Sequence, residues 1–400
     1  MDWSFLIKNK TTITVTTDSR KVTRGCVFVA LKGEHFDGND YVDQAIKDGA
    51  EYVIKGENAL AELQDLAHAW RRQWGKQILA ITGTNGKTTT KELTAAVLRT
   101  KYNVLYTEGN YNNSLGVPLT LLRLTKAHDF AIVEMGASHP GDIKELVDVA
   151  EPDFGLITNV GRAHLQGFGS FEGVMRTKGE LYDYLAEHHG TIFQNADNPH
   201  LKQMYITAQR SHSVSGLTSH SEVVSYSSGP MLSGTHLVGD YNSENIQAAL
   251  CVGEYFGISR EDGEAAVRAY VPTNNRSQAM KTEHNDLVID AYNANPTSMQ
   301  AAINAFRSNS EAVYILGSMR ELGDYTKLEH QNVVNMLLER KADKVYLVGN
   351  EWHTTTAPFP IYETVDDLAA YLKDHPLTAC HILVKGSRSN QLERIIPYLQ

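Results

Sequence analysis

The chain has 400 residues, more than a single hydrophobic core usually organises, so we expect about two or three domains. Its 37 basic and 47 acidic residues give a formal net charge of −10, which argues against a general nucleic-acid-binding surface and leaves phosphate recognition to local loops. The three cysteines, Cys26, Cys251 and Cys380, have no paired spacing, so neither a disulfide framework nor a zinc site is indicated.

The sequence shows no sign of membrane insertion or secretion. No window approaches the roughly 20 uninterrupted apolar residues that a membrane helix needs. The first ten residues also lack the basic segment and apolar run of a secretory signal. We therefore expect a cytoplasmic protein.

Residues 1–76 are predicted to form a small α/β domain. Its expected strands and helices alternate along the chain, with strands at 13–15, 27–31 and 52–54 and helices at 41–47 and 60–74. Ser19 and Arg20 lie in a loop of this domain, where a hydroxyl and a forked guanidinium can together hold a phosphate. Asp-Ser-Arg is also an ordinary turn, and the short motif alone favours the turn.

The strongest motif is Gly-Thr-Asn-Gly-Lys-Thr at residues 83–88. An apolar strand at 78–81 precedes it and a helical pattern follows it, which is the setting of a phosphate-binding loop, although the usual pattern has a glycine where this chain has Ile81. Lys87 would reach the β- and γ-phosphates of ATP, and the Thr88 hydroxyl would be a Mg²⁺ ligand. The predicted ATP-binding residues of the loop are Gly83, Thr84, Asn85, Gly86, Lys87, Thr88 and Thr89.

Residues 77–272 are predicted to form this nucleotide-binding domain around a mostly parallel sheet. Further strands are expected at 104–106, 130–133, 154–158, 191–193 and 236–238, and the Ser-rich stretch 211–233 is expected to be a surface β meander. Glu134 ends one of the strands at the edge where parallel sheets bind ligands, so it is a candidate Mg²⁺ ligand.

Four other polar positions of this domain are less specific. Asn242 and Asn245 begin an alanine-rich helix, where they could read a base edge or cap the helix. Taken alone, His164 is best explained as a structural loop histidine and Lys178 as a solvated helix lysine.

Residues 273–400 are predicted to form a doubly wound, Rossmann-like α/β domain. Strands are expected at 287–289, 313–316, 344–348 and 381–384, and each ends in a polar or glycine-containing loop. The fold class is therefore α/β, with a small N-terminal domain, a central P-loop domain and this C-terminal domain.

Taken together, these motifs resemble the Mur ligases over essentially the whole chain. Singly several of them are weak, but their shared order is specific. They are Asp18-Ser19-Arg20, Asp37-Gly38, the run 83–92, Asn112-Asn113, Glu134-Met135-Gly136-Ala137, the run 159–165, Lys178-Gly179-Glu180, the run 292–296, Glu321-Leu322-Gly323 with His330, and Lys385-Gly386-Ser387-Arg388.

The resemblance implies roles for residues that the sequence alone leaves open. Glu134 and His164 would be metal ligands, and Lys178 would be carbamylated, which gives the cation an oxygen ligand. The catalytic residues would be Lys87, His164, Lys178 and Arg276. Nucleotide contacts would come from Asn242 and Asn245 at the adenine, Arg276 at the phosphates, and Asp290 and Asn293 at the ribose or phosphates. Substrate contacts would come from Ser19, Arg20, Asn113, Lys385 and Ser387.

The resemblance also implies a reaction and its substrates. It is nearest to the ligases of peptidoglycan precursor synthesis that join D-alanyl-D-alanine to UDP-N-acetylmuramoyl-tripeptide through an acyl phosphate, with ATP and one or two Mg²⁺ ions. We expect these small-molecule substrates, no nucleic acid, and a monomer. The alternatives are the ligase that adds the third amino acid, a folate polyglutamate synthase, and a P-loop ATPase without ligase activity.

Overall fold

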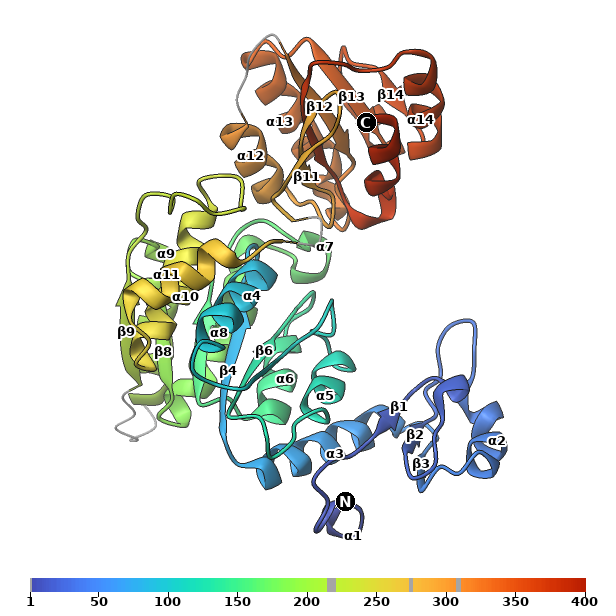
Figure 1. Cartoon of the computed structure of the whole chain (residues 1–400), viewed down its shortest axis with the longest axis vertical. Helices are drawn as coiled ribbons and strands as arrows, with labels where there is room; N and C mark the ends of the chain where they lie inside the picture. Colours follow the sequence, from blue (N-terminus) through green and yellow to red (C-terminus); the bar gives the residue numbers. More distant parts are fainter. Residues whose placement is uncertain (1, 214–220, 273–275, 307–310) are drawn as a thin grey trace.

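The computed structural model describes residues 2–213, 221–272, 276–306 and 311–400. Three sheets divide the described chain into an N-terminal, a middle and a C-terminal part, which follow one another along the molecule (Figure 1). The predicted three-part α/β architecture is confirmed. The domain boundaries at residues 76 and 272 remain predictions.

The N-terminal part has a three-stranded parallel sheet in the order β1-β2-β3. The central strand, Val-Phe-Val, is buried along its whole length, as its apolar, β-branched and aromatic residues favour. The elements of this part are α1 (Ser4–Ile7), β1 (Val15–Thr16), η1 (Ser19–Lys21), β2 (Val27–Val29), η2 (Gly38–Tyr41), α2 (Val42–Lys47), β3 (Tyr52–Ile54) and α3 (Ala59–Trp74).

Helix α3 joins the N-terminal part to the middle part. Its apolar face packs against α5 (Gly116–Leu121) and α6 (Asp142–Ala150). The indole Nε1 of Trp70 donates to the backbone oxygen of Leu124 at 3.0 Å. The helix ends at Gly75, whose φ of 67° is the left-handed conformation in which glycine commonly follows a helix.

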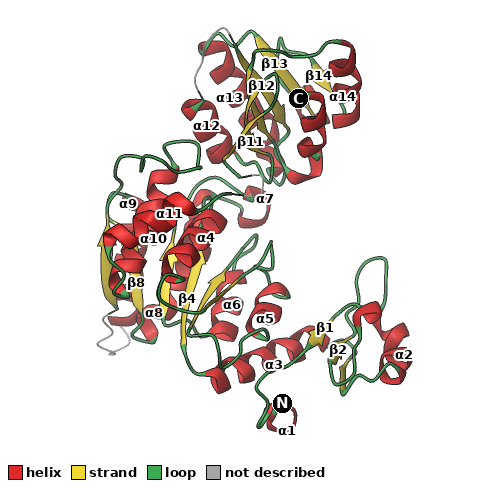
Figure 2. Cartoon of the chain, viewed as in Figure 1, coloured by secondary structure: helices red, strands yellow, loops and turns green. Residues whose placement is uncertain are grey.

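The middle part is built on a six-stranded parallel sheet in the order β5-β6-β4-β7-β8-β9. Helices cover both of its faces (Figure 2). The strands are β4 (Gln77–Thr82), β5 (Val104–Tyr106), β6 (Phe130–Glu134), β7 (Phe154–Ile157), β8 (Thr191–Asn195) and β9 (Glu222–Tyr226). The remaining helices are α4 (Lys87–Leu98), α7 (Leu165–Phe168), α8 (Phe171–Glu187), α9 (Pro199–Ser213), α10 (Asn242–Tyr255) and α11 (Arg260–Ala269).

Two predictions for the middle part are wrong. The expected strand at 236–238 is reduced to an isolated antiparallel bridge between Leu237 and Gln278. The Val238 N–H donates to the Ser277 oxygen beside this bridge, and the Val238 oxygen accepts from the Asn242 side chain, so the pairing does not extend. The Ser-rich stretch forms no meander in its described residues. It contributes β9, which pairs in parallel with β8 and completes the sheet. Residues 214–220 of that stretch lie outside the described chain.

The C-terminal part has a six-stranded sheet in the order β10-β11-β15-β12-β13-β14, in which only the pairing of β10 with β11 is antiparallel. The short outer strands β10 and β14 were not predicted. The strands are β10 (Gln278–Lys281), β11 (Asp286–Asp290), β12 (Ala312–Gly317), β13 (Lys344–Val348), β14 (Ile361–Tyr362) and β15 (His381–Lys385). The helices are α12 (Pro296–Ala305), η3 (Gly323–Tyr325), α13 (Thr326–Glu339), η4 (Asn350–Thr354), α14 (Val365–Asp374), η5 (Arg388–Asn390) and η6 (Leu392–Tyr398).

The helices of the described residues include none that combines the length and the apolar character needed to span a membrane.

Candidate active site

A cleft of about 880 Å³ lies where the carboxyl ends of the middle strands face the C-terminal part. This is the edge at which open parallel sheets bind ligands. Its lining comes from the loop after β4, the loops after β5, β6 and β7, the start of α10, and the C-terminal segments 276–277, 290–301, Glu321 and Lys385.

Glycine is required twice in the loop after β4. Gly83 has a φ of 145°, and a Cβ there would lie 1.9 Å from the Thr158 hydroxyl. Gly86 has a φ of 79°, and a Cβ there would lie 2.4 Å from Asn245 Oδ1. Other residues rarely adopt these φ values, and both positions lack space for a side chain. The two glycines therefore let the loop close against β7 and α10.

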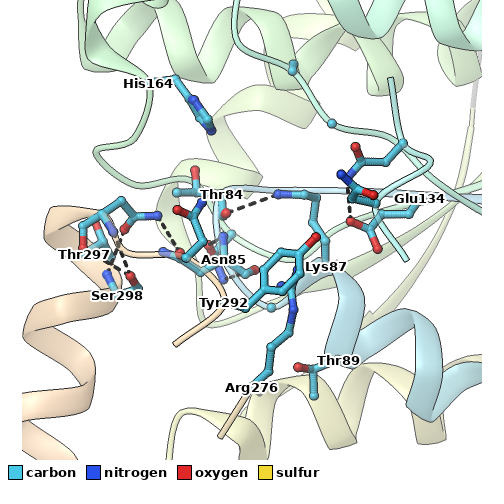
Figure 3. A pocket seen from close by; sticks show the side chains of 18 of the residues that line it. Thr84, Asn85, Lys87, Thr89, Glu134, His164, Arg276, Tyr292, Thr297 and Ser298 are labelled. Carbon is cyan, nitrogen blue, oxygen red and sulfur yellow. Dashed lines mark hydrogen bonds between the residues drawn. The ribbon is translucent and has the colours of Figure 1, made fainter. Parts of the chain in front are cut away.

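Lys87 bends back over the loop from the first turn of α4. Its Nζ donates to the backbone oxygens of Gly83 at 2.8 Å and Thr84 at 3.3 Å. Figure 3 shows the Lys87 side chain pointing back toward Thr84. Burial lowers the pKa of Lys87, and the nearby Arg276 adds to this effect while Glu134 opposes it. The ammonium is thus positioned at the cleft surface with two weak neutral partners that an anion can replace.

Glu134 joins three elements at the floor of the cleft. Its Oε2 accepts the Thr88 hydroxyl at 2.9 Å and its Oε1 accepts Asn112 Nδ2 at 2.8 Å. Burial alone would raise the pKa of this carboxyl, but Lys91, Lys87 and other donors lower it overall. Glu134 is therefore an ionised oxygen donor beside the hydroxyl of the phosphate-binding loop.

Lys91 is a charged residue of this region that the sequence analysis missed. It is fully buried, with Nζ 3.6 Å from Glu134 Oε2 and 3.7 Å from Glu92 Oε1. Its spacing of four residues from Lys87 places both lysines on one side of α4, which is the signal that could have indicated it.

His164 and Lys178 both approach the ring of Phe168. The His164 ring lies edge-on to it with centroids 6.2 Å apart, and Lys178 Nζ is 5.8 Å from its centroid. His164 lines the cleft and contacts the Glu321 carboxylate. Hydrogen bonding to His164 is the main cause of a lowered pKa of Glu321.

The interpretation of Lys178 as a solvated lysine is wrong. It is 2% exposed on the inner face of α8, because Thr177, Leu181 and Leu185 share that buried side of the helix. Burial is the main cause that lowers the pKa of Lys178 well below the ordinary value, and Lys87 contributes. Within the described residues its Nζ makes no hydrogen bond, and Lys178 is not one of the residues that line the cleft.

Asn242 and Asn245 form a network at the start of α10. Asn245 Oδ1 accepts the Thr90 hydroxyl at 3.0 Å, and Asn245 Nδ2 donates to Asn242 Oδ1 at 2.9 Å. Neither caps the helix, whose N-cap is Tyr241 without a side-chain bond. Of the two interpretations, capping is therefore wrong, and both amides line the cleft.

The C-terminal part contributes an ion pair to the opposite wall. Lys385 Nζ lies 2.5 Å from Asp290 Oδ2 and donates to the backbone oxygen of Asn293 at 3.3 Å. These three residues line the cleft. Ser387 is buried behind them, with its hydroxyl 3.5 Å from the oxygen of Ala294, and does not line the cleft.

Hydrogen bonds connect the middle and C-terminal walls of the cleft directly, and they were not predicted from the sequence. Asn295 Nδ2 donates to Asn85 Oδ1 at 2.8 Å. Arg162 Nη1 donates to Glu329 Oε1 at 2.9 Å, and its N–H donates to Thr297 Oγ1 at 3.0 Å. Asn295 also caps α12 with Ser298, a pattern that the Asn-Pro pair could have indicated.

Of the three predicted substrate contacts outside the C-terminal part, only Asn113 lines the cleft. Ser19 and Arg20 lie in η1 of the N-terminal part. The Arg20 guanidinium donates two hydrogen bonds to the Asp18 carboxylate, at 2.8 and 2.9 Å, and the side chain is 87% exposed. The structure therefore does not bring these two residues together with the P-loop.

Comparison with known proteins identifies the family. The models "Mur ligase family, catalytic domain", "Mur ligase middle domain" and "Mur ligase, glutamate ligase domain" match residues 13–101, 81–253 and 275–388. The UDP-N-acetylmuramoyl-tripeptide--D-alanyl-D-alanine ligase of Bacillus subtilis (strain 168) is 33% identical over 96% of this chain and 92% of its own length. The chain belongs to the Mur ligase family.

Two further relatives are similar to this Mur ligase over nearly its whole length. The ligase of the same name from Escherichia coli (strain K12) is 34% identical over 96% of this chain and 93% of its own length. The crystal structure of the Thermotoga maritima MurF ligase in complex with ADP superimposes with a TM-score of 0.84 at 26% identity, covering 98% of each chain.

Proposed function

We propose that this Mur ligase joins D-alanyl-D-alanine to UDP-N-acetylmuramoyl-tripeptide and uses ATP, giving the UDP-linked pentapeptide, ADP and phosphate. The observation that carries this function is the similarity to two ligases of that activity at 33 and 34% identity over 96% of the chain. The similarity extends through the N-terminal, middle and C-terminal parts. It therefore covers all the parts that such a reaction needs for its three substrates.

ATP occupies the cleft in this proposal. The support is the P-loop with its two required glycines and the ADP found in the Thermotoga maritima relative. Lys87 then exchanges its carbonyl partners for phosphate oxygens, and Gly83 to Thr89 surround the phosphates. Asn242 and Asn245 contact the adenine, and Asp290 and Asn293 contact the ribose or phosphates.

The donor set on the cleft floor suits Mg²⁺, which prefers oxygen ligands and binds through few protein groups together with phosphates. The Thr88 hydroxyl and the Glu134 carboxylate lie 2.9 Å apart there. Among the described residues no three His, Cys, Asp or Glu side chains gather into a metal site, so an all-protein cage is not what the fold offers. When bound, the ion neutralises charge on the transferring phosphate.

Carbamylation of Lys178 is part of the proposal. A lysine is carbamylated when its neutral amine attacks CO₂ and releases a proton, and burial favours the neutral amine of Lys178 by lowering its pKa well below the usual lysine value. The carbamate adds a carboxylate-like group near His164 and Phe168. Together with Thr88, Glu134 and His164 it gives the metal ligand set that the family resemblance implies.

The chemistry requires alignment and charge neutralisation more than acid–base groups. The terminal carboxylate of the tripeptide attacks the γ-phosphorus of ATP, the bond to ADP breaks, and an acyl phosphate forms. The neutral amine of D-alanyl-D-alanine then attacks the acyl carbon, loses a proton and displaces phosphate. Lys87 and Arg276 stabilise the charge on the phosphoryl oxygens during the first step.

The remaining parts hold the other substrates. Ser19 and Arg20 bind the UDP group, and the peptide extends from there past Asn113 to the cleft. Lys385 and Ser387 contribute to the site of the incoming dipeptide. The enzyme acts as a cytoplasmic monomer on these small molecules and needs no nucleic acid.

The function is tested by phosphate release from MgATP with each substrate alone and with both, with mass spectrometry of the product. Release that requires both substrates and yields the pentapeptide supports the proposal. Release with a single amino acid instead of the dipeptide identifies the ligase of the third residue, and release indifferent to both identifies an ATPase.

A further inference from the structure

Two arginines approach one aromatic ring at the C-terminal wall of the cleft. Arg276 Cζ lies 3.8 Å from the centroid of the Tyr292 ring, and Arg388 Cζ lies 5.3 Å from it. Arg276 and Tyr292 line the cleft, and Figure 3 shows the Arg276 side chain beside the Tyr292 ring. Arg388 is exposed and begins η5, shortly after the end of β15.

The backbone brings Arg276 and Tyr292 together. In the antiparallel pair of β10 and β11, Gln278 lies opposite Ile289. If this register is continued two residues back from Gln278 and two residues forward from Ile289, Arg276 lies beside the segment that carries Tyr292. Ser277 fixes the approach, because its φ is 47° and its N–H donates to Asp290 Oδ1 at 3.4 Å.

The two guanidinium groups differ from the other cation of this wall in having no carboxylate partner. Lys385 is neutralised by Asp290 at 2.5 Å. In the described chain neither Arg276 nor Arg388 forms an ion pair with a carboxylate. The Nε atom of Arg276 is buried and has no hydrogen-bond partner there. Two like charges beside one ring attract an anion to this place.

We propose that Tyr292 is a positioning residue that holds Arg276 ready for the transferring phosphoryl group. This inference rests on the proposed ATP-dependent function. A ring contacts the face of a guanidinium and leaves its N–H edges available for phosphate oxygens, whereas a carboxylate partner occupies those edges and compensates the charge. Tyr292 therefore orients Arg276 without neutralising it.

The test is a double-mutant cycle on kcat and KM for ATP in the ligation assay, with Tyr292→Leu, Arg276→Gln and the double variant. We expect Tyr292→Leu to lower kcat/KM about tenfold, the size of a desolvated cation–π contact. The same substitution should have little further effect in the Arg276→Gln background, because it acts through the guanidinium. Tyr292→Phe keeps the ring and should recover most of the activity.

Arg99→Gln is the matched control. Arg99 stacks on Tyr106 at 4.5 Å in the same manner, but it does not line the cleft, so its loss should leave ligation unchanged. Melting temperatures are measured for every variant, and Tyr292→Met replaces the leucine variant in the cycle if that variant melts lower than the native chain.

The outcomes separate the inference from the function on which it rests. If the native chain releases phosphate only when both substrates are present, the proposed function is supported, whatever the variants do. Equal losses from Tyr292→Leu in the native and Arg276→Gln backgrounds would overturn the positioning role, and so would a phenylalanine variant as impaired as the leucine variant.

Discussion

Lys91 Nζ lies 3.6 Å from Glu134 Oε2, and both side chains are buried. The pair connects the helix that follows the P-loop to the end of the neighbouring strand β6. A second carboxylate oxygen, Glu92 Oε1, lies 3.7 Å from the same ammonium, so one buried cation faces two carboxylates. Its charge therefore helps to keep Glu134 ionised at the cleft floor.

The first prediction concerns this pair. Lys91→Met leaves Glu134 without its nearest cation and should reduce the free energy of unfolding by about 3 kcal/mol, the cost of breaking a buried pair by removing one partner. Adding Glu134→Gln removes the stranded charge and should recover part of the loss. Urea unfolding of the two single variants and the double variant measures both effects. Strictly additive losses would show that the two side chains do not interact.

The second prediction compares two glycines with left-handed backbone. Gly86→Ala places a Cβ 2.4 Å from Asn245 Oδ1 and should abolish nucleotide binding, because the loop must move away from α10. Gly75, which follows α3, has a φ of 67°, and a Cβ added there would lie 3.6 Å from its nearest neighbouring atom. Gly75→Ala should cost about 1 kcal/mol of stability and leave nucleotide binding intact. Calorimetric titration with ADP distinguishes the two, and equal affinities would refute the steric argument.

The third prediction tests the carbamate. If Lys178 carries the proposed carbamate, Lys178→Ala should lower the rate of ligation at least about a hundredfold, because the variant cannot form that charged ligand. Removal of CO₂ should lower the activity of the native enzyme, and bicarbonate should restore it. Bicarbonate should not restore the alanine variant. Native activity that is independent of CO₂ would remove the carbamate from the account.

The fourth prediction concerns acid stability at the end of α6. Burial opposes ionisation of Glu151, but hydrogen bonds from Arg72 and His68 lower its pKa from 4.5 to about 2. Because the folded pKa is the lower one, this stabilisation is complete above the unfolded pKa and disappears as the pH falls from about 4.5 to about 2.

Arg72→Gln should remove part of that dependence. The melting temperatures of the variant and the native chain should differ at neutral pH and converge as the solution is acidified through this range. A difference that stays constant with pH would show that Arg72 acts through packing alone. Lys144→Gln provides the control, since it removes a surface ion pair to Asp148 on the same helix without touching Glu151.

The local sequence predicted the parts of the site that one segment forms. The P-loop needs a strand, two glycines, a lysine and a helix start within about a dozen residues, so its position could be predicted. Glu134 could be placed because an apolar strand of a parallel sheet ends there.

Contacts between distant segments could not be predicted in this way. The stacking of Arg276 on Tyr292 depends on the register of two strands, one of which is short and polar, and the bond from Asn295 to Asn85 joins different parts of the chain. Lys178 looked solvated because a lone lysine usually is, and only the packing of α8 shows that its position faces inward.

Phosphate release with and without the two peptide substrates tests the proposed ligase activity most directly. We predict that the purified chain releases phosphate from MgATP only when UDP-N-acetylmuramoyl-tripeptide and D-alanyl-D-alanine are both present, and that the pentapeptide forms in equal amount. Phosphate release that is the same without either substrate, with no pentapeptide detected, would contradict it.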